Sequence, residues 1–359
     1  MQIGLVGLQF SGKTTLFNTL SKNSSQVASA KEEASIEVVK VPDERLNELT
    51  KIFNPKKQVN ATIEVFDIPG LKMSDDNKVK ITSTFLNSVR NNDALFYVIR
   101  GFNDDSVSHP MGNIDPLRDV EFLEMEFLLS DMAFLETRHE KLKRDVLKTK
   151  DEKMKRELPV IEKCLAHCEK ELPLRTIHLD ENELRLLSGY QLLTIKQLGI
   201  AVNYDENSTA SVDTEIEKLK TKLEKYHTII IPFFAKIELE LSEMNPEDQT
   251  AFMHDYGIKE SALSKILRTS YEMLGLQSFF TVGEDECRAW TIKKNYTAQQ
   301  AAGVIHTDFF NRFIRAEVVH YEDFLKYGSF NKCKEAGAWR LEGKEYIVKD
   351  GDILNIRHN

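Results

Sequence analysis

The residues best suited to chemistry stand near the start of the chain, in the run GLQFSGKT from Gly7 to Thr14. The run has the glycine, lysine and hydroxyl spacing of a P-loop, and it lies between an apolar strand (Gln2–Val6) and a helical stretch. Glycines let backbone N–H groups converge on phosphate oxygens, and the start of a helix adds positive potential. The spacing therefore predicts a binding site for a nucleoside triphosphate.

The side chains of this run have separate expected roles. Lys13 should reach the β- and γ-phosphates, Thr14 should ligate Mg²⁺, and Thr15 should contact the α-phosphate. Mg²⁺ is thus the expected cofactor. The other nucleotide contacts expected from the loop are at Gln9, Phe10, Ser11 and Gly12.

A second motif, Asp67-Ile-Pro-Gly70, follows the apolar strand Ile63–Phe66. In P-loop NTPases an Asp in this place holds Mg²⁺, usually through water, and the Gly N–H senses the γ-phosphate. A lone DxxG also spells an ordinary turn, but its place at a strand end downstream of a P-loop favours function. We therefore expect Lys13, Asp67 and Gly70 to be catalytic, with Thr14 and Asp67 as metal ligands.

The residue after this motif bears on the rate of hydrolysis. Many small GTPases orient the attacking water with a Gln there. Here the residue is Leu71, whose side chain cannot hydrogen-bond a water molecule. The sequence therefore predicts slow intrinsic hydrolysis.

The run from Ile200 to Glu206 ends another apolar strand, where GTPases place N-K-x-D. It contains Asn203 and Glu206 at N-x-x-E spacing, with Tyr204 in place of the Lys. Glu206 is one methylene longer than Asp and would crowd the exocyclic amine of guanine, which adenine lacks. The altered motif predicts relaxed or ATP-preferring specificity, although Asn and Glu at a strand end are also common turn residues.

The elements that position these motifs follow three patterns. Residues 1–127 alternate short apolar strands with helical stretches, which is typical of a mainly parallel α/β sheet. Strand-like sequence returns at Ile200–Asn203 and Ile229–Pro232. From about residue 278 the pattern becomes β-rich. We expect a P-loop nucleotide-binding domain over 1–127 and 198–277, an inserted helical hairpin over 128–197, and a small domain over 278–359.

The inserted hairpin is predicted from a heptad-like seam. The first helix has apolar seam positions alternately four and three apart, and a second run repeats the spacing from Ile161 to Leu172. The polar stretch 148–157 should turn one helix into the next, with Pro159 in the first turn of the second helix. The seam residues of the first helix are Leu128, Met132, Leu135, His139, Leu142 and Val146.

The bulk composition bounds the class of protein. The 359 residues carry a formal charge of -9, which excludes a uniformly basic nucleic-acid coat. No apolar run reaches the roughly 20 residues of a membrane span, and the N-terminus lacks the layout of a signal peptide. Four cysteines make no disulfide framework in a chain of this length. We expect a cytoplasmic monomer with reduced thiols and no membrane partner.

The order of the motifs resembles the YchF branch of the Obg-like P-loop ATPases. The similarity is carried by GxxxxGKTT, VPDERL at 41–46, TIEVFDIPGL at 62–71, and N-x-x-E. The C-terminal run FFTVGEDECRAWTIKKNYTAQQAAGVIHTDF at 279–309 is more specific and resembles the TGS domain, a β-grasp module, of that family. The resemblance covers nearly the whole chain.

The resemblance implies slow ATP hydrolysis with GTP accepted less well, and the ribosome as partner. It also implies that Asn203 and Glu206 face the base. Ala235 and Lys236 lie where the family's last base-contacting loop reads Ser-Ala-Lys. The expected function is a ribosome-associated, Mg-dependent ATPase acting as a translational or stress switch. The alternative is a nucleotide-gated adaptor for RNA or the ribosome with little or no hydrolysis.

The chain departs from the family pattern in its switch regions, which indicates a divergent paralogue. Phe234 replaces the Ser of the base-contacting loop, and Lys31 stands where the family has a Thr that covers magnesium. The segment after DxxG is normally glycine-rich, but residues 71–100 contain no glycine. These changes bear on turnover more than on nucleotide binding.

Other candidates have simpler structural interpretations. Cys164, His167 and Cys168 invite a metal or redox role, but a cysteine on an apolar seam is usually a small core residue. Residues 139–157 hold eight Lys or Arg against five Asp or Glu, which indicates a solvated helix face or a contact with ribosomal RNA phosphates. Further candidates for RNA contact are His306, Arg312, Arg315 and Arg340.

Overall fold

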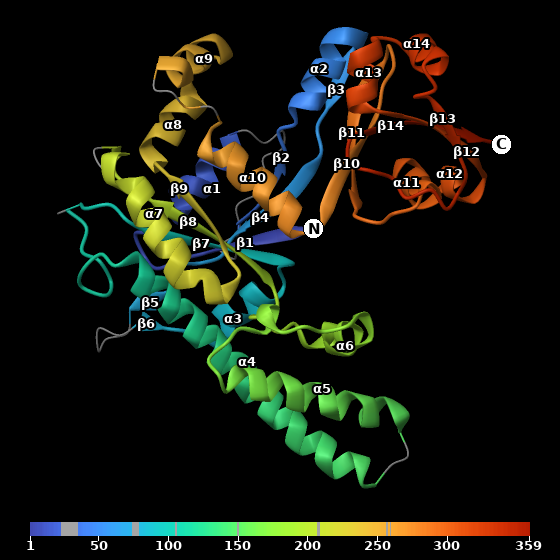
Figure 1. Cartoon of the computed structure of the whole chain (residues 1–359). Helices are drawn as coiled ribbons and strands as arrows, with labels where there is room; N and C mark the ends of the chain where they lie inside the picture. The colour runs from blue at the N-terminus through green and yellow to red at the C-terminus, as the bar shows by residue number, and fades with distance from the viewer. Residues whose placement is uncertain are drawn as a thin grey trace. The chain divides into compact units, whose positions relative to one another are not determined.

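The computed structural model describes residues 1–22, 35–73, 79–104, 106–148, 151–206, 209–255, 258 and 260–359. They divide into two compact units, shown in Figure 1. The first consists of Met1–Glu37 and Glu64–Ile266, and the second of Val38–Ile63 and Leu267–Asn359. The predicted α/β class is confirmed, with a P-loop domain, a helical insertion and a C-terminal sheet domain.

The first unit is built around a six-stranded sheet. Its strand order is β2-β4-β1-β7-β8-β9, and every pairing from β4 through β9 is parallel. Parallel strands that are buried on both faces read as continuous apolar runs, as ALFYVIR does in β7. The strands span Gln2–Val6 (β1), Ser35–Lys40 (β2), Thr62–Asp67 (β4), Ala94–Arg100 (β7), Gln197–Asn203 (β8) and Ile229–Phe233 (β9).

Helices connect these strands, as parallel pairing requires. A short two-stranded sheet of β5 (Lys72–Met73) and β6 (Val79–Lys80) follows β4. The helices between these strands include Lys13–Lys22 (α1), Ser83–Arg90 (α3), Pro116–Val146 (α4) and Thr209–Leu223 (α7). After the last strand come Ala235–Glu243 (α8), Pro246–Asp255 (α9) and Ala262–Met273 (α10), and α10 continues into the second unit.

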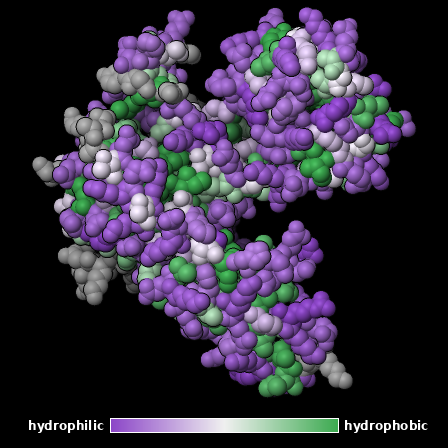
Figure 2. Space-filling view, in the orientation of Figure 1, coloured by the Kyte–Doolittle hydropathy of each residue, from purple (hydrophilic) through white to green (hydrophobic). Residues whose placement is uncertain are grey.

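The predicted antiparallel hairpin is formed by α4 and α5 (Glu152–Cys168) and extends away from the sheet in Figure 1. Within α4 the packing changes at one point: Phe127 belongs to the core of the sheet, whereas Leu128 belongs to the core of the hairpin. Figure 2 shows hydrophobic surface gathered along the hairpin between hydrophilic faces. The predicted domain bounds themselves stay a prediction.

The turn of the hairpin lies earlier than the sequence predicted. The α5 helix begins at Glu152 because the Asp151 carboxylate caps the Lys153 and Met154 amides. Pro159 is therefore inside the helix and not in its first turn. Glu157, expected in the turn, is buried and pairs with Arg138 across the hairpin at 2.6 Å. Because Glu157 is already packed within the helix before Pro159, the helix continues through the proline.

Buried polar side chains fasten the hairpin to the sheet. Asp131 of α4 accepts hydrogen bonds from the Leu193 and Thr194 amides of the returning chain, at 2.9 and 2.8 Å. Glu124 of α4 accepts from the Tyr97 hydroxyl of β7 at 2.8 Å and pairs with Arg175. A buried charge is tolerated only when it is paired in this way. The base of the hairpin is thus joined to a central strand.

The second unit holds another six-stranded sheet, of order β13-β12-β14-β10-β11-β3. Its core contains Phe279, Ile292, Val318 and Leu354. The strands are Leu276–Thr281 (β10), Glu286–Lys293 (β11), Phe313–His320 (β12), Arg340–Glu342 (β13) and Asp352–His358 (β14). The helices are Ala298–Ile305 (α11), Thr307–Asn311 (α12), Tyr321–Tyr327 (α13) and Phe330–Glu335 (α14).

A segment from the first third of the chain completes this second unit, which sequence analysis did not predict. Helix α2 (Glu44–Phe53) and strand β3 (Lys57–Val59) belong to it, and β3 pairs in parallel with β11. Arg45 of α2 bonds to both Asp43 and Asp350, each at 2.8 Å. Local sequence patterns do not predict the pairing of β3 with β11 or of Arg45 with Asp350, because the partners lie more than two hundred residues apart in the sequence.

The cysteines of the hairpin are core residues. Cys164 and Cys168 are both buried in the hairpin cluster, and His167 instead bonds to the Thr176 hydroxyl at 2.8 Å. Burial raises the pKa of the Cys164 thiol to about 11 and that of Cys168 to about 12. No helix in the described ranges is long and apolar enough to cross a membrane.

We predict that the hairpin cysteines resist alkylation in the native protein. Only the thiolate reacts, and the raised pKa values leave at least about a hundredfold less thiolate near neutral pH than an exposed cysteine has. Iodoacetamide labelling followed by mass spectrometry should show all four cysteines, which are buried, reacting fast only in denaturant. Rapid native labelling of Cys164 or Cys168 would instead favour a redox role.

Candidate nucleotide-binding site

The loop between β1 and α1 has the backbone geometry expected of a phosphate-binding loop. Helix α1 starts at Lys13, and the Leu16 amide donates to the Gly12 carbonyl at 2.9 Å. The first amides of a helix have no partner within it and can bind an anion. Gly12 has φ +90°, and a Cβ at Gly7 would lie 2.6 Å from the Val98 carbonyl oxygen. Both positions therefore require glycine.

The lysine of the loop is held by the acidic motif. Lys13 is buried and forms an ion pair with Asp67 at the end of β4. The Thr14 hydroxyl lies 3.4 Å from the other Asp67 carboxylate oxygen. The predicted residues Lys13, Thr14 and Asp67 thus converge on one point.

Those oxygens are suitable for Mg²⁺, which prefers hydroxyl, carboxylate, phosphate and water ligands. The Thr14 and Asp67 oxygens already lie together, and Lys13 balances the carboxylate charge. Thr14 and Asp67 would hold the ion, which would neutralise phosphate charge when bound. The donor set therefore fits the cofactor expected from the sequence.

The DxxG segment runs directly beside the P-loop. A Cβ placed on Gly70 would lie 3.9 Å from the Gly7 carbonyl oxygen, and Leu71 pairs with Leu8 in an isolated parallel bridge. The Leu71 side chain is only 2% exposed and belongs to the core of the sheet. It therefore turns into the core and offers nothing to a water molecule at the site.

An open hollow of about 520 Å³ lies over these elements. Phe10 lines this hollow in an unusual conformation. The residue is 58% exposed, and its backbone has φ +64°. Bulky residues rarely adopt this left-handed conformation. The predicted residues that line the hollow are Gln9, Phe10, Ser11, Gly12, Lys13, Thr14, Thr15 and Gly70.

The loop after β7 contributes three lining residues that sequence analysis missed, Phe102, Asp104 and Val107. Buried Arg100 organises this loop by donating to the carbonyls of Phe102, Asp104 and Val107 at 3.1, 3.3 and 3.0 Å. Hydrogen bonds from Ser106 lower the pKa of the Asp104 carboxyl, with smaller contributions from the Arg100 and Lys236 charges. One signal was available: β7 is the parallel neighbour of β1, so both strands end at the same edge of the sheet.

A buried histidine ties this same loop to α4. The His109 imidazole contacts the Asp119 carboxylate at 2.9 Å and accepts from the Met111 amide through Nδ1. Burial lowers the pKa of His109 and raises that of Asp119, while Arg118 contacts the second Asp119 oxygen. The neutral imidazole, with its proton on Nε2, satisfies both contacts.

The residues predicted to contact the base are arranged differently from those predicted to contact the phosphates. Asn203 is buried, and its side chain donates to the Ser11 carbonyl at 3.2 Å and accepts from the Ala235 amide at 3.1 Å. It therefore joins the P-loop to the start of α8. Tyr204, in place of the usual Lys, packs in the core, where a Cβ on Gly101 would lie 2.9 Å from its ring.

The remaining base-site residues do not line the hollow. Glu206 and Lys236 are exposed, and Ala235 is buried at the first turn of α8. Of the switch regions, Lys31 and most of Ala28–Ser35 lie outside the described residues, as do residues 74–78. The roles given to these residues stay predictions.

Comparisons with known proteins agree with this geometry. A family model described as "50S ribosome-binding GTPase" matches residues 2–136. A second model, YchF-GTPase_C, described as a protein of unknown function, matches residues 276–359. The two together cover both ends of the chain.

Similar proteins match over almost their full length. The ribosome-binding ATPase YchF of Haemophilus ducreyi is 38% identical over 99% of this chain and 98% of its own, and that of Bacillus subtilis is 37% identical with the same coverage. The solved structure of the Schizosaccharomyces pombe YchF GTPase aligns with a TM-score of 0.87 and 33% identity, over 99% of this chain and 97% of its own. The P-loop geometry, the inserted hairpin and these full-length matches together place the chain in the YchF family.

Proposed function

We propose that this protein binds a nucleoside triphosphate with Mg²⁺, prefers ATP to GTP, and hydrolyses it slowly. The observation that carries the proposal is that Lys13, Thr14 and Gly70 line one hollow at the start of α1. Asp67 contacts both Lys13 and Thr14 there. Phosphoryl transfer to water needs positioning and charge neutralisation more than covalent catalysis, and these groups supply both. Relatives named ribosome-binding ATPases support the same activity.

In the proposed cycle Lys13 exchanges partners. In the structure its ammonium pairs with Asp67, and on binding a nucleotide it would turn to the β- and γ-phosphates. Asp67 and Thr14 would hold Mg²⁺, which would supply positive charge beside the carboxylate. The Gly70 amide would contact the γ-phosphate.

Slow turnover follows from what the site lacks at one position. Leu71 is buried in the core, so the residue that follows DxxG cannot orient a water molecule. The exposed Phe10 ring adds an apolar wall to the hollow instead of a hydrogen-bond donor. The same features favour the second candidate, a nucleotide-gated adaptor with little or no hydrolysis.

The proposed preference for ATP is argued from Glu206. The proposed partner, the ribosome, is argued from the names of the relatives. The longer Glu206 side chain would crowd the guanine amine, whereas adenine presents no group there. Because relatives are named ribosome-binding, we propose that the protein acts at the ribosome, in the cytoplasm, as a translational or stress switch. The basic segment of the hairpin, residues 139–157, is a candidate for contact with ribosomal RNA phosphates.

The first test removes the phosphate lysine. Lys13→Ala should weaken Mg-ATP binding by about tenfold to a hundredfold, since hydrogen bonds to charged groups contribute about 1.5–3 kcal/mol. Titration with labelled ATP would measure it, with circular dichroism to confirm folding. Lys51→Ala, which removes one exposed lysine on α2, should bind like the wild type. Normal affinity in Lys13→Ala would refute the assigned site.

The second test addresses the choice of base. Glu206→Asp shortens the side chain and should raise GTP affinity relative to ATP several-fold, because the guanine amine gains room. Competition between labelled ATP and unlabelled GTP would give the ratio. Glu217→Asp on α7 makes the same chemical change at another exposed glutamate and is the matched control. An unchanged ratio in Glu206→Asp would exclude this residue as the base selector.

Phosphate release separates the two candidate functions. Slow release that disappears in Lys13→Ala would support an ATPase. Tight ATP binding without release above the Lys13→Ala background would support the adaptor instead.

A further inference from the structure

The hollow at the P-loop contains a glutamine side chain whose amide is free. Gln9 lines this hollow and is only partly buried. Its side chain forms no hydrogen bond with any residue in the described part of the chain. A side-chain amide has two N–H donors and a carbonyl acceptor. These groups are therefore available to a ligand or to a water molecule in the hollow.

Gln9 lies beside the glycine that is expected to face the γ-phosphate. A Cβ placed on Gly70 would lie 4.0 Å from the Gln9 Cγ atom, which is the carbon that carries the amide group. In P-loop NTPases the backbone N–H of the glycine in DxxG contacts the γ-phosphate. The free amide of Gln9 is therefore next to the place where the γ-phosphate would be held.

The charged groups around the hollow are already engaged. Lys13 and Thr14 both contact Asp67 and are assigned to the phosphates and Mg²⁺. The Asp104 carboxylate accepts hydrogen bonds from the Ser106 amide and hydroxyl at 2.9 and 2.5 Å, and these bonds lower its pKa. It is therefore negative near neutral pH and would repel a phosphate.

The neutral groups leave one candidate for contact with the attacking water. The Leu71 side chain is in the core, and Ser11 is only 2% exposed. Thr15 is expected at the α-phosphate, away from the bond that breaks. Gln9 carries the one side-chain amide among the described residues that line the hollow.

We propose that Gln9 orients the water molecule that attacks the γ-phosphate. Its carbonyl oxygen accepts a hydrogen bond from the water, and its N–H₂ group donates to a γ-phosphate oxygen. Many small GTPases use a glutamine after DxxG for this purpose, and here the glutamine comes from the P-loop itself. The assignment rests on the proposed function, because it requires a triphosphate bound in the hollow.

The assisted reaction is hydrolysis to ADP and inorganic phosphate. The water oxygen forms a bond to the γ-phosphorus. The bond from that phosphorus to the bridging oxygen breaks, and its electron pair stays on ADP. One proton of the water remains on the phosphate and the other passes to solvent. Gln9 keeps its own protons and fixes the direction of attack, and because its free side chain must be ordered for each turnover, hydrolysis stays slow.

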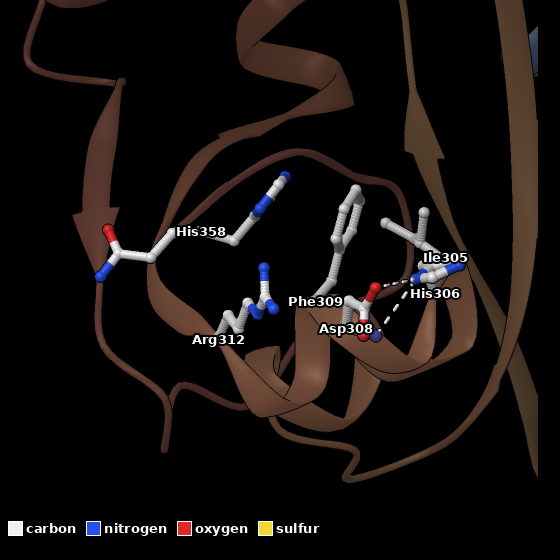
Figure 3. Close-up of a pocket in the computed structure, with 7 residues that line it drawn as sticks. Ile305, His306, Asp308, Phe309, Arg312 and His358 are labelled. Carbon is white, nitrogen blue, oxygen red and sulfur yellow. Dashed lines mark hydrogen bonds and ion pairs between the residues drawn. The ribbon is translucent and has the colours of Figure 1, made fainter.

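The second unit has a separate hollow of about 400 Å³, shown in Figure 3. None of its lining residues also lines the hollow at the P-loop. The Asp308 carboxylate there lies 3.6 Å from the His306 ring, and both residues are exposed. A change at Asp308 therefore shows whether an effect on hydrolysis is specific to the nucleotide hollow.

The test measures Mg-ATP affinity and single-turnover phosphate release in the full-length protein. Gln9→Leu keeps most of the side-chain bulk but removes the donor and the acceptor. It should bind Mg-ATP within about twofold of the wild type and release phosphate about tenfold to a hundredfold more slowly, because the lost contacts act in the transition state. Gln197→Leu, the same change at an exposed position at the start of β8, and Asp308→Asn should match the wild type.

A second variant tests the location of the side chain without measuring hydrolysis. Gln9→Glu places a carboxylate beside the γ-phosphate and should weaken ATP binding by about tenfold through charge repulsion. ADP lacks the γ-phosphate, so its affinity should stay close to that of the wild type. Titration with labelled ATP and ADP gives both values, and circular dichroism confirms that each variant is folded.

Three results would overturn this role for Gln9. The first is phosphate release at the wild-type rate in Gln9→Leu. The second is weaker ATP binding by Gln9→Leu with an unchanged release rate at saturating ATP, which would indicate a binding role alone. The third is equal weakening of ATP and ADP binding by Gln9→Glu.

The wild type separates this failure from that of the proposed function. If it binds Mg-ATP but releases no phosphate, the protein is the nucleotide-gated adaptor and the role of Gln9 is wrong. If it binds no Mg-ATP, the nucleotide site itself is wrong, and the role of Gln9 with it.

Discussion

The ion pair between Lys13 and Asp67 is the contact on which the site depends. It joins the first turn of α1 to the end of β4, which is paired with β1 in the sheet. Both charges are largely removed from water, and a buried charge needs a partner. The pair therefore fixes a lysine and a carboxylate where a triphosphate and a metal ion would each supply a replacement partner.

The rest of the first unit keeps these two groups in register. Parallel pairing brings the ends of β1, β4, β7 and β8 to one edge of the sheet, so the loops that follow them share a site. Arg100 shapes the loop after β7, and Asn203 joins the P-loop to α8. After β7 the chain passes through His109 into α4, where Asp119 contacts the His109 ring, and α4 continues to Val146 near the turn of the hairpin. The loop after β7, which lines the candidate nucleotide site, therefore leads directly into the first helix of the hairpin.

Local chemistry was predictable from the sequence, and distant pairing was not. The P-loop, DxxG and the strands around them could be placed because each motif carries its own spacing and apolar context. The seam of α4 was equally clear from Leu128 to Leu142. The contribution of residues 38–63 to the C-terminal sheet was not predictable, because Arg45 and β3 find their partners near the other end of the chain.

Two differences within the elements have a physical reason. The turn of the hairpin was placed too late because Pro159 suggested a helix start, whereas the Asp151 cap and the Arg138–Glu157 pair hold the helix together earlier. The contribution of Phe102 to the hollow was not predicted because this residue belongs to no motif, although the strand that precedes it, β7, pairs with β1. The resemblance to the YchF family supplied the C-terminal module, which no catalytic motif would have indicated.

The most direct test of the account is the Mg²⁺ dependence of ATP binding, measured by titration with labelled ATP in Mg²⁺ and in EDTA. If Asp67 and Thr14 hold the ion while Lys13 turns to the phosphates, the wild type should bind ATP more tightly in Mg²⁺, and Asp67→Asn should lose most of that difference. Equal affinity in the two buffers, with no effect of Asp67→Asn, would contradict the exchange of partners around the Lys13–Asp67 pair.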